Sequence, residues 1–239
     1  MLRVGLTGGL GSGKSTVAGM LRSLGAEVTE SDALGREMMQ PGHAVYHEIV
    51  RHFGPEIVNP DGQLNRARLA DLAFRQGKLH ELNAIVHPPV IAAQKRWMEE
   101  VSTRDPNAIA VVESALIFEV VRDALARGET NHPLAGASSD RSSSPGLLAD
   151  WRKRIDRVIV VAAPDRLKVA RYAARIDPSG TNRAAIEADA MQRLSYQVPD
   201  AEKAAQADYV LDNSGDIDAL RTQVLALWPR LQAESNKIR

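Results

Sequence analysis

The sequence has no cysteine, no excess of one charge and no long hydrophobic run. The absence of cysteine excludes a disulfide framework, a thiolate nucleophile and a cysteine-rich zinc site. The 30 Lys and Arg residues balance the 30 Asp and Glu residues, which argues against a large nonspecific surface for nucleic acid or membrane. No apolar run is long enough to span a bilayer, and the first residues lack the apolar core of a signal peptide. We therefore expect a cytoplasmic protein with no nucleic-acid or membrane partner.

Short apolar segments alternate with helical patterns along the chain. Apolar runs that stop at glycine, proline or charged residues predict strands at residues 2–6, 109–112 and 158–161, with weaker signals at 26–29 and 209–211. Helical periodicity marks residues 15–24, 67–74, 90–101, 166–175 and 217–227. Strands that alternate with helices predict an α/β fold with a parallel five-stranded sheet flanked by helices. A chain of 239 residues has room for one such domain and one inserted subdomain.

A glycine-rich string follows the first predicted strand. Residues 8–15 read GGLGSGKS and match the phosphate-loop pattern G-x-x-x-x-G-K-[ST] between a predicted strand and a predicted helix. A plain glycine-rich turn is the alternative, but it leaves a lysine followed by two hydroxyl residues unexplained. The residues expected to bind the nucleotide are Gly11, Ser12, Gly13, Lys14, Ser15 and Thr16.

The chemistry of phosphate binding requires these residue types. Glycines let successive backbone N–H groups approach phosphate oxygens, and the start of the following helix adds the positive end of its dipole. We expect Lys14 to reach the β and γ phosphates of ATP and Ser15 to join the shell of Mg²⁺, with support from Thr16. The string therefore predicts a P-loop protein that binds ATP with Mg²⁺.

Other motifs of large P-loop classes are absent. The base-reading motif N-K-x-D of GTP switches is missing, and Glu113 is followed by Ser114 where an ATPase motor has an acidic pair. An ATP-dependent small-molecule kinase fits the length, the run of helical patterns and the arginines late in the chain. Two alternatives remain: another nucleoside or nucleotide kinase, and a regulatory protein that binds ATP without phosphoryl transfer.

An ordered set of residues resembles the dephospho-CoA kinase family over nearly the whole chain. The set consists of GLTGGLGSGKST at residues 5–16, Asp32-Ala33, Arg36, Pro41-Gly42, Phe53-Gly54, Asp61-Gly62, Arg66, His87-Pro88, LIFE at residues 116–119, Arg193, Gln197, Ala207-Asp208 and Asp212-Asn213. The resemblance implies transfer of the γ-phosphoryl group of ATP to the ribose 3′-hydroxyl of dephospho-CoA, the last step of coenzyme A biosynthesis. The sequence departs from the family pattern at Glu30-Ser31, at Glu113 and in the lengths of two loops.

Residues 33–103 hold several helical patterns in a row with no convincing strand, which predicts a helical subdomain, and the resemblance implies a division of the chain. Residues 1–32 and 104–239 form the nucleotide-binding core, which includes a lid at about 166–197, and residues 33–103 form a helical insertion that binds the acceptor. Residues 128–148 contain a Ser-rich stretch and predict a flexible loop, to which we assign no function. A monomer or weak homo-oligomer is expected.

Asp32, Arg175 and Glu113 are candidate functional residues with structural alternatives. Asp32 follows the second strand and either orients the acceptor hydroxyl, the role that the resemblance favours, or caps a helix. Arg175, with Arg171 and Arg193, either neutralises charge on the transferred phosphoryl group or lies on a solvated helix face. Glu113 either holds Mg²⁺ with Ser15 or is a structural carboxylate.

Three further assignments rest on the resemblance or on position alone. Arg66 and His87 contact the acceptor by resemblance, and a core or capping role is the alternative for both. Asp212-Asn213 follows the last strand and either approaches the adenine or forms a turn.

Overall fold

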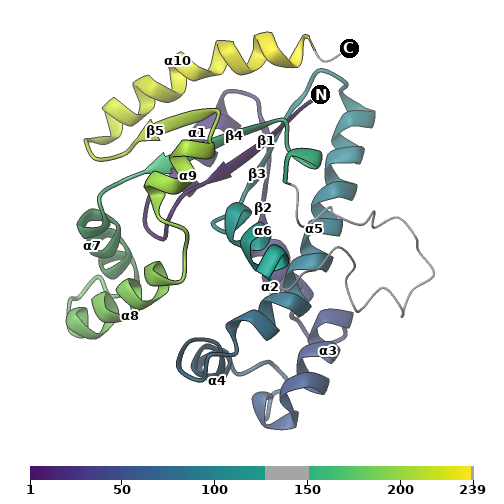
Figure 1. Ribbon diagram of the computed structural model, residues 1–239, viewed down its shortest axis with the longest axis vertical. Helices are drawn as coiled ribbons and strands as arrows, with labels where there is room; N and C mark the ends of the chain where they lie inside the picture. The colour runs from purple at the N-terminus through teal and green to yellow at the C-terminus, as the bar shows by residue number, and fades with distance from the viewer. Residues whose placement is uncertain (127–150, 238–239) are drawn as a thin grey trace. The chain divides into compact units, whose positions relative to one another are not determined.

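The computed structural model describes residues 1–126 and 151–237, which form two units (Figure 1). The core unit is Met1–Thr29 with Met98–Arg239, and the helical unit is Glu30–Trp97. The predicted loop at 128–148 lies outside the described residues. No helix in the described residues combines the length and hydropathy that a membrane crossing requires.

The core unit is built on a parallel five-stranded sheet in the order β2-β3-β1-β4-β5. Its strands are β1 (Leu2–Thr7), β2 (Glu27–Glu30), β3 (Ile109–Glu113), β4 (Arg157–Ala162) and β5 (Tyr209–Asp212). Its helices are α1 (Lys14–Ser23), the end of α5 (Leu79–Arg104), α6 (Ile117–Ala126), α7 (Asp165–Ile176), α8 (Arg183–Ser195), α9 (Asp200–Gln206) and α10 (Ile217–Ser235). The predicted fold is confirmed, with all five strands at their predicted places.

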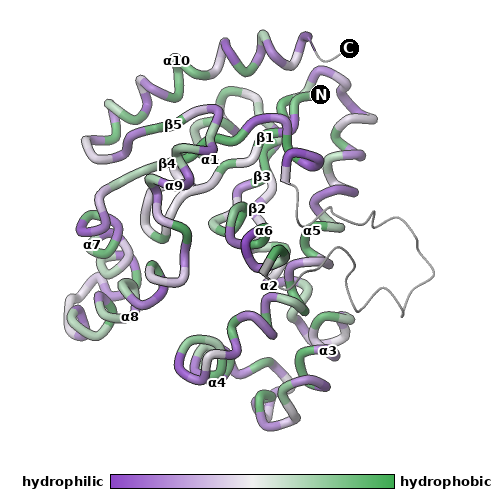
Figure 2. The backbone as a smooth tube through the Cα atoms, viewed as in Figure 1, coloured by the Kyte–Doolittle hydropathy of each residue, from purple (hydrophilic) through white to green (hydrophobic). Residues whose placement is uncertain are grey.

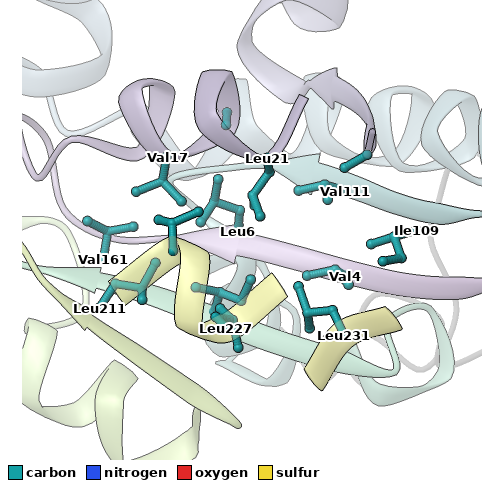
Figure 3. Close-up of a cluster of buried hydrophobic side chains, with 14 of the residues drawn as sticks. Val4, Leu6, Val17, Leu21, Ile109, Val111, Val161, Leu211, Leu227 and Leu231 are labelled. Carbon is teal, nitrogen blue, oxygen red and sulfur yellow. The ribbon is translucent and has the colours of Figure 1, made fainter. Parts of the chain in front are cut away.

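One face of the sheet packs against α1 and α10. Figure 3 shows Val17 and Leu21 of α1 and Leu227 of α10 directed at Val4 and Leu6 of β1. Figure 2 shows hydrophobic and hydrophilic residues alternating along α10, as expected for a helix with one buried face. Burial of this apolar surface fixes the helix that follows the glycine loop onto the sheet.

The other face of the sheet carries a second cluster. Val158 and Val160 of β4 pack there with Ile117 of α6. Ile159 and Val161 of the same strand point to the opposite face and pack in the cluster formed with α1 and α10. Because successive side chains of a strand point to opposite faces, a run that is apolar at every position indicates a strand covered on both sides. This explains why the central strands read as continuous hydrophobic runs.

The register of β1 places its end beside the end of β3. Leu6 of β1 pairs with Glu113 of β3, and Ser114 donates its backbone N–H to the carbonyl oxygen of Leu6 at 2.9 Å. Parallel strands end at the same side of a sheet, so Glu113 and the glycine loop meet there.

Apart from Glu30, the last residue of β2, the helical unit contains no strand among its described residues. Its elements are α2 (Ser31–Met38), α3 (Ala44–Phe53), the 3-10 turn Pro55–Ile57, α4 (Arg66–Ala70), the π-helical turn Asp71–Arg75 and the first part of α5. Ile49, Ile57 and Leu69 lie in its own hydrophobic cluster. Asn65 caps α4 by accepting a hydrogen bond from the backbone N–H of Arg68 at 3.0 Å.

Candidate functional site

The phosphate loop, residues 8–13 between β1 and α1, requires glycine at Gly11 and at Gly13. Gly11 has a φ of 74° and Gly13 a φ of 99°, both in the left-handed region. A Cβ on Gly11 would lie 2.2 Å from the carbonyl oxygen of Lys168, and a Cβ on Gly13 would lie 2.2 Å from Nδ2 of Asn213. Backbone conformation and close neighbours therefore both require glycine here.

α1 begins at Lys14, immediately after the loop. Gly13 is its N-cap, and the Nζ atom of Lys14 donates to the carbonyl oxygen of Gly9 at 3.1 Å. The first N–H groups of a helix have no acceptor within the helix, and the helix dipole adds positive potential at the same place. The loop, the ammonium group and the start of the helix together have the polarity that suits an anion such as phosphate.

A hydroxyl and a carboxylate meet beside this loop. The Oγ atom of Ser15 donates to Oε1 of Glu113 at 3.1 Å, and Glu113 is buried at the end of β3. Mg²⁺ prefers such hard oxygen ligands and commonly binds through one or two protein groups together with substrate phosphates. The residues therefore fit a Mg²⁺ ion, and the structure brings together the two residues that the sequence predicted as its ligands.

Asn213 supports the loop from the end of β5. Its Nδ2 atom donates to the carbonyl oxygen of Ser12 at 2.7 Å, and this bond is buried. Arg171 of α7 donates to the carbonyl oxygen of Asn213 at 2.9 Å. The sequence left adenine contact and a turn open for Asp212-Asn213, but Asn213 has a third role, because it braces the phosphate loop.

The late arginines lie on a pair of helices, α7 and α8, that pack against each other (Figure 1). Arg175 is exposed, with its guanidinium 5.6 Å from the centre of the Tyr172 ring. Arg193 donates to Asp189 at 2.7 Å, and the same carboxylate accepts from the Tyr172 hydroxyl at 3.2 Å. Burial raises the pKa of Tyr172, and Asp189 raises it further. Arg171 is joined to the loop through Asn213.

Asp32 lies in the first turn of α2, two residues after β2. The N-cap of α2 is Glu30, and Asp32 is exposed. The capping alternative for Asp32 is therefore wrong, because the cap position falls two residues earlier. A carboxylate in the first turn still benefits from the positive end of the helix dipole.

The helical unit contains a pocket of about 530 Å³. Its walls come from α2, α4, the turn after α4, the start of α5 and the segment around the isolated bridge between Val58 and Leu64. The lining residues are Arg36, Met39, Gln40, Asn59, Gln63, Leu64, Arg66, Leu69, Ala70, Ala73, Phe74, Leu79 and Leu82. Apolar walls with a few amides and guanidinium groups are typical of small-molecule sites of this size.

The two residues predicted to contact the acceptor differ in position. Arg66 is exposed and lines the pocket, while Asn65 supplies the cap of α4, so neither a core nor a capping role applies to Arg66. His87 is half-buried within α5 and is not among the lining residues.

Sequence reasoning assigned no role to several residues that contact the phosphate loop. Gln197 and Asp200 accept hydrogen bonds from loop N–H groups, and Lys168 bonds to Asp200. A weak signal existed, because Gln197 belongs to the set that carries the family resemblance. Lys168 and Asp200 look like ordinary helix-surface charges in the sequence.

The comparisons with known proteins agree with this architecture. The family model described as dephospho-CoA kinase matches residues 2–128 and 144–219. A dephospho-CoA kinase of Moorella thermoacetica is 35% identical over 97% of this chain and 93% of its own length. One of Thermobifida fusca is 36% identical over 97% of both chains.

Solved structures show the same fold. A crystal structure from Thermus thermophilus superposes with a TM-score of 0.64 at 32% identity, covering 96% of this chain and 97% of that one. A dephospho-CoA kinase from Campylobacter jejuni has the same fold, with a TM-score of 0.59 at 17% identity over 97% of each chain. Because the family model and these relatives match nearly the full length, the chain belongs to the dephospho-CoA kinase family.

Proposed function

We propose that the chain transfers the γ-phosphoryl group of ATP to the ribose 3′-hydroxyl of dephospho-CoA, giving coenzyme A and ADP. The observation that carries the proposal is the contact of Ser15 with Glu113 beside the glycine loop, which pairs a phosphate site with oxygen ligands for Mg²⁺. The choice of acceptor is supported by family membership. A cytoplasmic location and a monomer or weak homo-oligomer remain predictions from the sequence.

The core unit provides the donor side of the proposed reaction. The N–H groups around the start of α1 bind the phosphates, and Lys14 exchanges its contact with the Gly9 carbonyl for the β and γ phosphates. Ser15 and Glu113 would hold Mg²⁺, which would neutralise charge on the phosphate oxygens. Arg175 of α7 neutralises charge on the transferred group.

The helical unit provides the acceptor side. Asp32 accepts a hydrogen bond from the acceptor hydroxyl and orients it for attack on the γ phosphorus. The pocket binds part of the acceptor, with Arg36 and Arg66 directed to its phosphates and the apolar wall to its methylene-rich arm. His87 contributes to acceptor binding by resemblance alone.

An acceptor panel tests the proposal. ADP release is measured with ATP, Mg²⁺ and one of dephospho-CoA, a nucleoside or a nucleoside monophosphate, and the phosphorylated position of the product is determined by NMR. We expect turnover with dephospho-CoA and a phosphate at the 3′ position. Lys14→Ala and Asp32→Asn should each lower kcat by about 100-fold or more, because each removes a group that acts on the transferred phosphoryl or on the nucleophile.

Two results would separate the alternatives. Turnover of a nucleoside or nucleotide without turnover of dephospho-CoA makes the chain a different kinase. ATP binding without ADP formation from any acceptor makes it a regulatory ATP-binding protein.

A further inference from the structure

A short segment before and within α9 contacts the first half of the phosphate loop. The backbone N–H of Leu10 donates to Oε1 of Gln197 at 3.0 Å. The backbone N–H of Gly9 donates to Oδ1 of Asp200 at 3.2 Å. Two consecutive peptide groups of the loop are therefore held by side chains that lie 187 and 191 residues away in the sequence.

Asp200 also joins the loop to β4 and α7. Its Oδ2 atom accepts from the backbone N–H of Ala163 at 3.3 Å and from Nζ of Lys168 at 3.0 Å. The side chains of Lys168 and Asp200 are only 3% and 14% exposed, so their pairing is weakly screened by solvent. The carbonyl oxygen of Lys168 is also the atom that a Cβ on Gly11 would meet.

The segment that carries Gln197 and Asp200 is itself anchored to α6. Oε1 of Glu119 accepts from the backbone N–H of Val198 and from Nζ of Lys203, both at 2.8 Å. The side chains of Lys203 and Glu119 are 0% and 3% exposed, and Lys203 also donates to the carbonyl oxygen of Ala115. The segment from Gln197 to Lys203 is therefore fixed to α6 by a buried ion pair.

We infer that Gln197 and Asp200 are positioning residues that hold the phosphate loop in its binding conformation before ATP arrives. They bind the N–H groups of Gly9 and Leu10, so they do not compete for the groups from Gly11 to Thr16 that are proposed to bind phosphate. A loop fixed in advance loses less conformational entropy when its ligand binds. The inference rests on the proposed function only in taking ATP as the ligand.

The test measures ATP binding without acceptor. Gln197→Ala and Asp200→Asn are compared with the parent by calorimetric titration with Mg-ATP and by thermal melting. Loss of one such hydrogen bond corresponds to roughly tenfold in a binding constant. We expect the Kd and the KM for ATP to rise about tenfold in each variant, while the KM for the acceptor stays close to that of the parent. The Tm of Gln197→Ala should also stay close to that of the parent, whereas Asp200→Asn should lower the Tm as well, because it removes the charge that pairs with the buried Lys168.

Two matched substitutions serve as controls. Gln206→Ala removes an amide that bonds within α9, and Asp218→Asn removes an exposed carboxylate that pairs with Arg221 in α10. Neither contacts the loop, and neither should change the Kd for ATP.

The Kd for ATP and the Tm together distinguish a positioning role from a purely structural one. A lowered Tm with an unchanged Kd for ATP gives these residues a structural role only and overturns it. If Gln197→Ala does not fold, Gln197→Asn decides, because it keeps the amide but withdraws it from Leu10 by one methylene group. Failure of dephospho-CoA turnover in the parent would reject the proposed function and leave this binding test intact.

Discussion

The phosphate loop of the core unit and the pocket of the helical unit are built in different ways. The loop is one short stretch of consecutive residues, and it is held by the side chains of Gln197, of Asp200 in α9 and of Asn213 after β5. The pocket is lined by residues scattered between Arg36 and Leu82, none of which forms a motif with its neighbours.

This difference predicts how each region responds to change. The loop conformation depends on a few glycines with neighbours in close contact, so substitution of one of these glycines is expected to lower activity strongly. The pocket depends on many apolar contacts and a few polar groups, so single substitutions should weaken it gradually.

The largest loss of stability is expected when the buried ion pair between Lys203 and Glu119 loses one partner. Lys203→Met leaves Glu119 as an unpaired buried charge, and its Oε2 atom already has no hydrogen-bond partner in the described part of the chain. We expect the free energy of unfolding to fall by about 3–5 kcal/mol, measured by urea denaturation.

A surface pair provides the comparison for that loss. Arg183→Ala removes a half-exposed i,i+4 pair with Glu187 on α8 and should change the free energy of unfolding by less than about 0.5 kcal/mol. An equal loss of stability in both variants would mean that the buried pair does not anchor the segment that carries Gln197 and Asp200.

Two glycine-to-alanine substitutions, one in the loop and one in α1, test whether the loop needs glycine for its backbone geometry. Gly13→Ala places a Cβ 2.2 Å from Nδ2 of Asn213 at a φ of 99°, whereas Gly19 in α1 has nothing within 4 Å of an added Cβ. We expect Gly13→Ala to lower kcat/KM for ATP by about 100-fold, because the loop must shift by a large fraction of an ångström. Gly19→Ala should leave kcat/KM unchanged and raise the free energy of unfolding by about 1 kcal/mol. Similar kinetics for the two variants would refute the strict geometric requirement.

The sequence predicted the loop because its physics is local. Glycines, a lysine and a hydroxyl at fixed spacing between a strand and a helix determine one backbone conformation, and apolar runs at every position determined the central strands. The residues that hold the loop from other parts of the chain could not be predicted in this way. Lys168 and Asp200 lie in helices of mixed polarity, and only the tertiary fold shows that their charges are removed from water.

The pocket was predictable only as a helical region. Its lining alternates between helix faces, turns and the Val58–Leu64 bridge, so no period in the sequence identifies which side chains share a wall. The family resemblance selected Arg66 and His87, and the structure places only Arg66 on the pocket wall. The capping alternative for Asp32 was wrong because a helix boundary differs by two residues from the position that local sequence favours.

Two neighbouring arginines test the gradual response of the pocket. Arg66 lines the pocket, and Arg68, in the same helix, is exposed and does not line it. We expect Arg66→Ala to raise the KM for dephospho-CoA about tenfold through loss of one charged hydrogen bond, with the KM for ATP unchanged. Arg68→Ala should change neither constant. Equal effects of the two substitutions would show that the net charge of α4, and not the pocket, binds the acceptor.

The smallest effect is expected at Arg3 and Asp156, near the start of β1 and β4 and away from the loop. Arg3 donates from Nη2 to Oδ1 of Asp156 at 2.6 Å and from its backbone N–H to Oδ2 at 2.8 Å. Burial alone raises the pKa of Asp156, but the bonds and charge of Arg3 outweigh it, and the pKa lies below the ordinary value of 3.8.

A carboxyl group whose pKa is lowered by folding stabilises the fold above its unfolded pKa and loses this contribution as the pH falls through its folded pKa. Asp156→Asn should therefore lower the free energy of unfolding by about 1 kcal/mol at pH 7, and the difference from the parent should shrink below pH 3.8. Urea denaturation at several pH values measures this difference, with Asp218→Asn as the exposed control. A difference that does not depend on pH would mean that Asp156 acts through packing and not through its charge, and a change in the KM for ATP would mean that the two ends of the sheet are coupled.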